Sequence, residues 1–442
     1  MSPAPAISGH RVGVAVGADS AAFSVIDTAP WALRPRVLCA ALAVSGGSGE
    51  LNRIPCADRN AHPDPRNLWM KAGRHRSPRP ARPMRVPVLL VALILALTAA
   101  FSLGSSTEKS ASLTSGSSPP PRDPSVGISA VGDVIMGSTP ALPPDGGRHL
   151  FDGVADRLAG DVVLANLDQA LTDEAASTKC GSASSSCYAF RTPPSYARWL
   201  REAGFTVINL ANNHSRDFGD AGLRDTQAAL TAHNLQYTGM PGQITVQDVG
   251  SVRVAILGFA PYRWAQSLLD IPAAQEVVQQ AAAQADLVLV TIHAGAEGAD
   301  RGQVRPGTEI FLGEDRGDAV AFSHAVIDAG ADAVLGAGPH VLRGMEWYRG
   351  RLIAYSLGNF LGYQTLSHTG PQGVGGIVTL QLTPDGSWHG GQLEGTVMVD
   401  PGVPQIDPDK RARALVQELS RTDFGACGVQ VSAAGELNTP TC

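Results

Sequence analysis

Several apolar, strand-like runs of this sequence end in residues whose side chains commonly bind metal ions. VGISAVGD and DVVLANLD end in an aspartate, FTVINLANNH ends in an amide and an imidazole, and DLVLVTIH and ADAVLGAGPH each end in a histidine. The residues concerned are Asp133, Asp168, Asn213, His214, His293 and His340. Carboxylate, amide and imidazole together suit a borderline divalent cation such as Mn²⁺, Zn²⁺ or Fe²⁺. One or two such ions would support hydrolysis, by polarising a phosphoryl or carbonyl oxygen and lowering the pKa of a bound water.

Each of these residues also has an ordinary explanation when it is taken alone. Asp133 could cap a helix or close a turn, and Asn212 and Asn213 could satisfy a turn. A single histidine such as His293 or His340 is more often structural than a ligand. The repeated placement at the ends of five strand-like runs favours one shared metal site.

The elements that must position these residues alternate along the chain. Stretches with helical spacing, such as PPSYARWLREAG and DAVAFSHAVIDAG, separate the apolar runs. This alternation predicts an α/β fold with a largely parallel, buried sheet. Ligands of such sheets bind beyond the carboxyl ends of the strands. Two further runs around TPDGS predict a hairpin at the sheet edge.

The first quarter of the chain differs from the rest. Residues 1–70 show no sustained period, and residues 1–83 are predicted to be a disordered or non-native extension. Residues 71–85 carry six Lys or Arg and no acid, and the apolar run 86–103 follows them without a charge. This pattern predicts a membrane-targeting segment over 84–104, either a signal peptide or a transmembrane anchor.

The domain after this segment is expected outside the cytoplasm. Residues 105–125 are rich in Ser and Pro and predict a flexible linker, and the folded domain is expected over 126–402. An anchor would hold it at the extracytoplasmic face of the cell membrane, whereas cleavage would secrete it.

Cysteine spacing agrees with an exported domain. Four cysteines follow the apolar run, and they form two close pairs. Nearest-neighbour pairing predicts the disulfides Cys180–Cys187 and Cys427–Cys442, the second of which would staple a C-terminal tail over 403–442.

Several function classes are disfavoured. A net charge of -6 and a pI of about 6.0 argue against a general nucleic-acid binder. AYSLG resembles a nucleophile elbow around Ser356, but it lacks the first glycine, and no well-spaced acid and histidine follow. GAGPHV lacks the third glycine of a dinucleotide loop. The sequence contains no Walker loop and no HExxH motif.

The motifs SAVGDVIMG, VLANLDQALT, VINLANNHSRDFGDAGLRDT, VTIHAGAE and GADAVLGAGPHVLRGMEWYRGRLIAYSLGNFLG occur in this order. Together they resemble the CapA family of capsule-synthesis proteins, which includes the membrane-anchored protein of bacterial poly-γ-glutamate synthesis. The likeness covers about residues 126–362. It implies an αββα sandwich like that of calcineurin-like metallophosphatases, with a dinuclear metal centre.

The resemblance also implies roles for individual residues. The expected metal ligands are Asp133, Asn213, His293 and His340. The expected catalytic residues are His214, as a hydrogen-bond donor to the transition state or a second metal ligand, and Asp168. The expected rim of the site is formed by Asn166, Glu297, Ser356 and Asn359. Asp217 is expected to hold the NNH loop in shape.

The sequence departs from the family pattern at two places. The family usually reads NLE where this chain ends in Asp168, and it usually has a histidine before PHV, where this chain has Ala337 and Gly338. Three hypotheses follow. The protein is a component of capsule or poly-γ-glutamate production, with an anionic polymer and membrane polymer-synthesis subunits as partners. Alternatively, it is an envelope metal hydrolase acting on phosphoesters, or a non-catalytic module that binds an anionic polymer.

Overall fold

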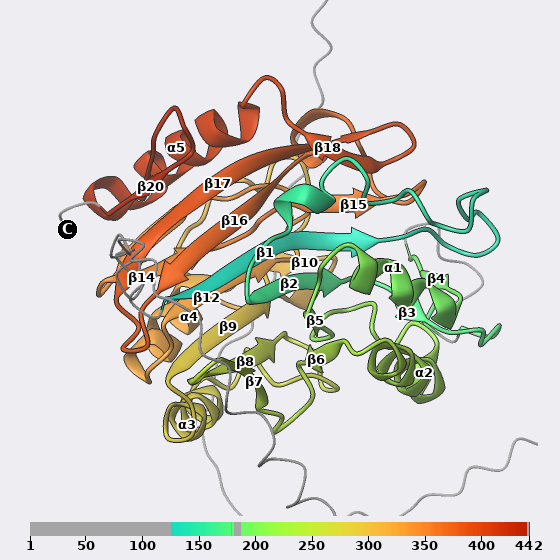
Figure 1. Cartoon of the computed structure of the whole chain (residues 1–442), viewed down its shortest axis with the longest axis horizontal. Coiled ribbons are helices and arrows are strands. Elements are labelled where there is room, and N and C mark those ends of the chain that lie inside the picture. Colours follow the sequence, from blue (N-terminus) through green and yellow to red (C-terminus); the bar gives the residue numbers. More distant parts are fainter. Residues whose placement is uncertain (1–124, 178, 181–186, 440–441) are drawn as a thin grey trace, which may run out of the picture. The chain divides into compact units, whose positions relative to one another are not determined.

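The computed structural model describes residues 125–177, 179–180, 187–439 and 442. This part of the chain has a mixed α/β fold built on two large β-sheets (Figure 1). The predicted N-terminal extension and membrane-targeting segment, together with nearly all of the linker, lie outside the described residues. Within the described ranges, helices are too short or too polar to cross a membrane.

The first sheet has the strand order β18-β17-β16-β1-β2-β5-β6, and β15 pairs with the end of β1. Its strands are β1 (Val126–Ile135), β2 (Val162–Leu167), β5 (Val207–Asn209), β6 (Gln236–Thr238), β15 (Asn359–Gly362), β16 (Val374–Leu382), β17 (Trp388–Val399) and β18 (Val403–Ile406). The strands β15, β1, β2, β5 and β6 run parallel, and β16 to β18 run antiparallel. The predicted hairpin is β16–β17. It is not at the edge, because β18 pairs with its outer side.

The second sheet has the order β13-β14-β12-β9-β8-β7. Its strands are β7 (Thr245–Val249), β8 (Val252–Phe259), β9 (Leu287–His293), β12 (Ala333–Ala337), β13 (Met345–Tyr348) and β14 (Arg351–Ala354). The four central strands are parallel, and the edge strands β7 and β13 are antiparallel. The predicted parallel arrangement therefore holds for the centre of this sheet.

Helices and short elements connect these strands. The helices are α1 (Ala197–Glu202), α2 (Gly219–Ala232), α3 (Ile271–Ala282), α4 (Ala319–Asp328) and α5 (Arg411–Phe424). The short strand pairs are β3 (Ala170–Leu171) with β4 (Arg191–Thr192), β10 (Ile310–Phe311) with β11 (Glu314–Asp315), and β19 (Gln430–Val431) with β20 (Leu437–Asn438). Single 3-10 turns are η2 (Ala155–Arg157), η3 (Pro194–Tyr196), η4 (Gly370–Gly373) and η5 (Gly425–Cys427). Asp270 and Asp318 cap α3 and α4 by accepting backbone N–H groups of the first turn.

Alternating side chains divide the apolar core into three layers. In β8, Val254 and Ile256 point between the two sheets, whereas Ala255 and Leu257 point outward, into the cluster that includes residues of α3 and α4. The outward side chains of β2 likewise join a cluster with residues of α1 and α2. Helices thus cover both outer faces, which gives the expected helix–sheet–sheet–helix sandwich. Both faces of the central strands β1, β2, β5, β9 and β12 are buried, and this explains their nearly continuous apolar runs.

The chain after residue 402 belongs to the same sandwich. β18 extends the first sheet, and Ala412 and Val416 of α5 pack into the core between the sheets. α5 lies alongside β17 (Figure 1). The segment expected as a C-terminal tail is therefore an integral part of the fold. Both predicted disulfides are confirmed, with Cα–Cα distances of 5.5 Å for Cys180–Cys187 and 5.0 Å for Cys427–Cys442.

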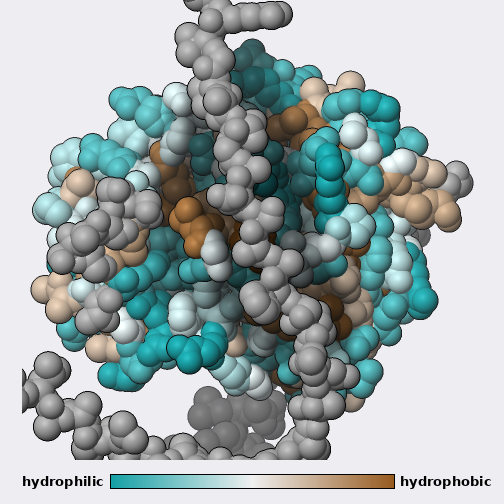
Figure 2. Space-filling model, turned by 180° about the vertical axis from the view of Figure 1, so that it is seen from behind, coloured by the Kyte–Doolittle hydropathy of each residue, from teal (hydrophilic) through white to brown (hydrophobic). Residues whose placement is uncertain are grey.

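Apolar side chains are largely withdrawn from the surface. The face seen from behind is mostly hydrophilic, with scattered hydrophobic residues between (Figure 2). Among the described residues, the large hydrophobic side chains with more than a third of their surface exposed are Tyr188, Leu269, Ile310, Leu312 and Val399. Within the described residues, large apolar side chains are therefore mainly buried in the core clusters.

Candidate metal centre

Polar residues form one row across four neighbouring parallel strands of the first sheet. Asp133 of β1 pairs in register with Asn359 of β15 on one side and with Asn166 of β2 on the other, and Asn166 pairs with Asn209 of β5. The four side chains are fully buried or nearly so. Since parallel strands present their carboxyl ends at one edge, residues that are far apart in sequence meet here.

The glycine of the GD motif, Gly132, is needed for steric reasons. A Cβ on Gly132 would lie 1.8 Å from the carbonyl oxygen of Gly358. The neighbouring Asp133 N–H donates to that same oxygen at 3.0 Å. The register of β1 against β2 shifts between Ala130 and Asp133, which is a bulge of the kind that redirects a side chain at the end of a strand. Only glycine at position 132 allows this close approach.

The carboxylate of Asp133 is held by several contacts. Asn166 donates its amide N–H to Oδ1 at 2.7 Å, and the Nδ1 of His340 lies 3.2 Å from Oδ2. The orientation of Asn166 is itself set, because its oxygen accepts from the amides of Asn209 at 2.9 Å and Asn212 at 3.1 Å. Burial alone would raise the pKa of Asp133, but the charge and hydrogen bond of His340 outweigh it and lower this pKa. Asp133 is therefore an ionised carboxylate in the core.

Asp168 is a buried carboxylate that no described residue satisfies with a hydrogen bond. Its side chain is fully buried, and neither carboxylate oxygen has a hydrogen-bond partner among the described residues. Burial raises its pKa to about 6, and the neighbouring Asp133 charge acts in the same direction. A buried carboxylate without a hydrogen bond is costly unless a cation compensates it. Such a group is the strongest sign that this site binds a positive ion.

The imidazole of His340 lies between Asn359 and the carboxylate of Asp168. Its Nδ1 lies 2.8 Å from Oδ1 of Asn359, whose amide N–H groups are turned toward the carbonyl of Gln372. Its Nε2 lies 3.8 Å from both Asp168 and Glu297. Burial opposes protonation, but the Asp133 carboxylate outweighs it and raises the pKa of His340 to about 10. The backbone φ of His340 is 59°, a left-handed conformation that costs energy in a residue other than glycine.

His293, at the end of β9, completes a group of three. Ligand atoms of Asp133, Asp168 and His293 all lie within 4.8 Å of one another, so these three residues could hold a metal ion. The Nδ1 of His293 is 3.7 Å from Asp133, and its Nε2 is 3.4 Å from the guanidinium of Arg316. Burial lowers the pKa of His293 well below its ordinary value, which leaves the ring neutral and able to bind a metal.

The NNH loop lies beside this group. The side chain of Asn212 accepts the backbone N–H groups of His214 and Ser215, which closes the loop. The Nδ1 of His214 lies 2.7 Å from the buried carboxylate of Asp217 and 3.1 Å from the amine of Lys179. Asp217 also accepts the Lys179 amine at 2.5 Å, as well as a backbone N–H. This arrangement orients the imidazole and leaves its Nε2 for a ligand.

A cavity of about 240 Å³ opens next to these residues. Its lining includes Lys179, Asn213, His214, Glu297, Phe311 and Arg316. The side-chain oxygen of Asn213 is buried, and it too has no partner among the described residues. An uncommitted amide oxygen and an oriented imidazole therefore flank a space that could admit a small anionic group.

The donor set fits a divalent metal. Carboxylates and neutral imidazoles are the ligands of Mn²⁺, Zn²⁺ and Fe²⁺, and the partnerless oxygens of Asp168 supply the negative charge. Asp133, Asp168 and His293 would hold the ion, with Nε2 of His340 beside them.

The structure gathers nine of the ten residues named from the sequence around this centre. Asp133, Asn166, Asp168, His293, Glu297, His340 and Asn359 are in mutual contact, and Asn213 and His214 line the cavity beside them. Ser356 lies apart. Its hydroxyl donates to the carbonyl of Val341 and accepts the backbone N–H of Gly358, so it supports the loop after His340.

Three participants were not found from the sequence. Asn209 orients Asn166, Lys179 contacts the His214–Asp217 pair, and Arg316 contacts His293 and Glu297. Of these three residues, only Asn209 could have been found from the sequence, because it stands inside the NLANNH motif. Lys179 and Arg316 lie in loops, without a strand-end position to mark them.

Sequence relatives include proteins of capsule and PGA biosynthesis. The chain is 35% identical over 182 residues to the capsule biosynthesis protein CapA of Bacillus anthracis, which covers 37% of this chain and 41% of the relative. It is 29% identical over 259 residues to the PGA biosynthesis protein CapA of Bacillus subtilis, covering 54% and 64%. The chain thus matches less than two thirds of the length of either relative.

Similarity to solved structures is more remote. The 5'-nucleotidase precursor of Thermus thermophilus aligns with 68% of this chain and 59% of its own, at 13% identity and a TM-score of 0.37. At this level the likeness identifies neither an activity nor a substrate.

A family profile matches a similar share of the chain. The profile of the bacterial capsule synthesis protein PGA_cap covers residues 127–364, which is more than half of the chain. This range contains every residue of the candidate metal centre described above. The chain therefore belongs to the family of bacterial capsule synthesis proteins.

Proposed function

We propose that this protein acts in capsule or poly-γ-glutamate biosynthesis, through a divalent-metal site that engages the anionic polymer or a precursor of it. The observation that carries the proposal is the buried carboxylate of Asp168, which has no hydrogen-bond partner among the described residues. It stands within 4.8 Å of Asp133 and His293 ligand atoms, in a chain of the capsule-synthesis family. Membrane polymer-synthesis subunits would be its partners.

Several residues around the site would take part in binding and activating a ligand. A bound divalent ion supplies a Lewis acid that polarises a phosphoryl or carbonyl oxygen. His214, oriented by Asp217, is placed to donate a hydrogen bond or a proton from Nε2 to charge that develops on a ligand in the cavity. Lys179 adds a positive charge beside it.

The proposed location is the extracytoplasmic face of the cell membrane. Support comes from the basic segment 71–85 followed by the apolar run 86–103, and from the two disulfides of the folded domain. Cleavage of the apolar run would release the same domain as a secreted protein. Membrane fractionation of cells expressing the full chain distinguishes an anchored protein from a released one, and recovery in the cytosol would refute both.

An envelope metal hydrolase acting on phosphoesters is the second candidate. The His214–Asp217 pair favours it, because an imidazole oriented by a buried carboxylate is suited to proton transfer. A non-catalytic polymer-binding module is the third, and the glycine at position 338 favours it, because the related family usually carries a histidine there.

One experiment separates these candidates. The full chain loaded with Mn²⁺, and the chain carrying Asp133→Ala, would be tested for binding of poly-γ-glutamate and for turnover of a phosphodiester. We expect polymer binding or cleavage that needs the metal and is lost in the variant. Phosphodiester turnover without any effect on the polymer would favour the hydrolase. Polymer binding that persists unchanged in the variant would favour the module, and no activity in either assay would refute the proposal.

A further inference from the structure

The guanidinium of Arg316 is buried among the candidate ligands. Arg316 follows the β10–β11 hairpin, and 1% of its side chain is exposed. Its Nη1 donates to Glu297 at 2.8 Å, and its Nη2 lies 3.4 Å from Nε2 of His293. Its Nε has no partner among the described residues. A buried arginine with an unused N–H group is therefore part of the site.

Arg316 occupies the contacts that a second ion would need. Nε2 of His293 and a carboxylate oxygen of Glu297 both face the guanidinium, so His293 offers only Nδ1 to the side of Asp133. Position 338 supplies no further ligand, because it is a glycine. A Cβ on Gly338 would lie 3.0 Å from the backbone nitrogen of Ala294 and 3.1 Å from the ring of His293, at a φ of +113°.

The charges of the site also argue against a second metal ion. Asp133 and Asp168 are fully buried, and Glu297 is 20% exposed, which gives three carboxylates around one centre. One divalent ion and one guanidinium balance three negative charges. A second divalent ion would leave at least two positive charges in excess, and uncompensated charge in a buried site is costly.

We propose that this centre holds a single divalent ion, and that Arg316 is the fixed positive charge that takes the place of a second one. The inference rests on the proposed metal-dependent function. Since Arg316 also lines the cavity, an anionic oxygen of a ligand would meet one ion and one guanidinium there. The guanidinium offers N–H donors to such an oxygen at defined angles, which a metal ion does not.

The number of ions can be counted without an activity assay. The full chain would be titrated with Mn²⁺, and the bound metal followed by calorimetry and by electron paramagnetic resonance. We expect wild-type protein to saturate at one Mn²⁺ with the spectrum of an isolated ion. Arg316→Gln removes the charge, so we expect a second Mn²⁺ to bind, with the spectrum of two coupled ions. Arg316→Lys restores a charge and should return the count to one.

Two results would overturn the inference. They are two coupled ions in wild-type protein, and a folded Arg316→Gln variant that binds one ion with unchanged affinity. Arg413→Gln is the matched control. Arg413 of α5 is a mostly buried arginine that is paired with Glu394 of β17, away from the centre. This variant should leave the count at one. Wild-type protein that takes up no Mn²⁺ would refute the proposed metal-dependent function itself, together with this inference.

Discussion

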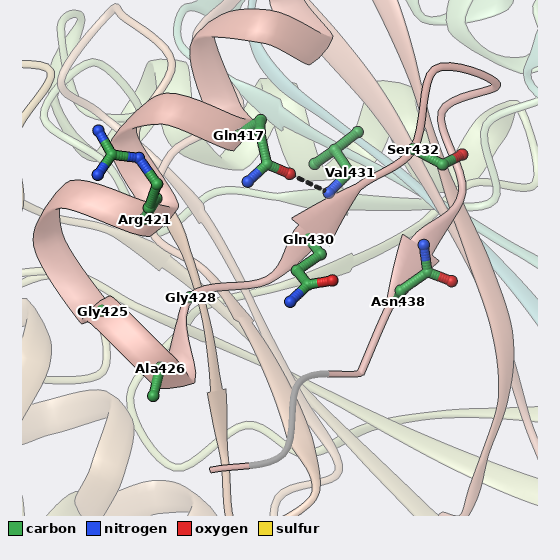
Figure 3. A pocket seen from close by; sticks show the side chains of 9 residues that line it. All are labelled: Gln417, Arg421, Gly425, Ala426, Gly428, Gln430, Val431, Ser432 and Asn438. Atoms are coloured by element: carbon green, nitrogen blue, oxygen red, sulfur yellow. Dashed lines mark hydrogen bonds between the residues drawn. The ribbon is translucent and has the colours of Figure 1, made fainter.

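Two hollows of the same domain differ in how their polar atoms are used. The cavity beside the metal centre measures about 240 Å³ and contains Asn213 and Arg316, each with a buried polar atom that lacks a partner among the described residues. The hollow beneath α5 is larger, at about 310 Å³. There Gln417 accepts the backbone N–H of Val431 at 2.6 Å, as Figure 3 shows, and Arg421 is paired with Glu418 at 2.7 Å.

The two hollows therefore differ less in size than in how their polar groups are satisfied. Beneath α5, the amides of Gln430 and Asn438 belong to exposed residues and can be satisfied by water. At the metal centre, ionisable groups are held away from water and close to one another. Burial raises the pKa of Asp168 and lowers that of His293, whereas the Asp133 carboxylate raises the pKa of His340. Perturbed and unpartnered buried groups are typical of sites where chemistry or binding takes place.

Removing a carboxylate from the metal centre should have the largest effect. We expect Asp168→Ala to weaken Mn²⁺ binding by more than about a hundredfold, since loss of a residue that merely supports a ligand already costs about 10–100-fold. Isothermal titration calorimetry measures this affinity.

The matched control for this change is Asp332→Ala. Asp332 is also a buried aspartate, but it accepts the backbone N–H of Val288 at 2.8 Å and is paired with Arg351 at 3.1 Å. This variant should bind Mn²⁺ as wild type does. Equal losses in both variants would mean that the partnerless carboxylate has no special role, and the contrast between the two hollows would fail.

Without metal, the same carboxylate should destabilise the fold. The folded-state pKa of Asp168 is raised from 3.8 to about 6, so the free energy of unfolding of metal-free protein falls as pH rises from about 4 to about 6. Asp168→Asn removes this dependence. We expect the variant to be more stable than wild type by up to about 3 kcal/mol at pH 7, and no more stable below pH 4.

Urea unfolding at several pH values, with metal removed by a chelator, measures this difference. A stability difference between the two proteins that does not change with pH would contradict the assignment of a buried, ionised Asp168. With added Mn²⁺, the wild type should become more stable than Asp168→Asn, because only the wild type has the carboxylate that would bind the ion.

Opening the disulfide next to the hollow beneath α5 should affect stability alone. Cys427 and Cys442 are 15 residues apart, and a cross-link of this loop length stabilises by about 3 kcal/mol. We expect the double variant Cys427→Ser and Cys442→Ser to lose up to this amount in urea unfolding. Its Mn²⁺ affinity should equal that of wild type, and a large change in affinity would couple the two regions.

The smallest effect is expected inside the hollow beneath α5. Gln417→Ala removes the hydrogen bond to Val431 and should cost about 1 kcal/mol of unfolding free energy. Gln430→Ala, at an exposed glutamine of the same hollow, is the control and should change stability by less than about 0.5 kcal/mol. Loss of polymer binding in either variant would instead identify this hollow as a functional surface.

Local patterns were enough to predict much of the fold and of the candidate site. Apolar runs of strand length, separated by helical stretches, predicted the strands β1, β2, β5, β9 and β12. Polar residues at the ends of these runs predicted Asp133, Asp168, His293 and His340, because a strand end is a local feature and parallel strands present their ends at one edge. Close spacing likewise predicted both disulfides.

Contacts between distant segments had to come from the tertiary structure. Arg316 reaches His293 and Glu297 from a loop after a short hairpin, and no periodicity marks such a residue. Ser356 stands in a strand-end motif like the ligands, yet its hydroxyl is used by the backbone around His340. The C-terminal segment joins the sandwich because β17 offers it an unpaired edge.

The sequence by itself determined which side chains stand at the strand ends, and hence the class of ligand they can bind. Tertiary structure decided which of these side chains remain without partners. Asp168 and Asp332 are both buried aspartates. The residues packed around Asp332 give it a hydrogen bond and an ion pair, whereas no described residue forms a hydrogen bond with Asp168. Because hydrogen bonds and ion pairs depend on groups brought together across the whole chain, the availability of a buried carboxylate for a metal is a property of the fold.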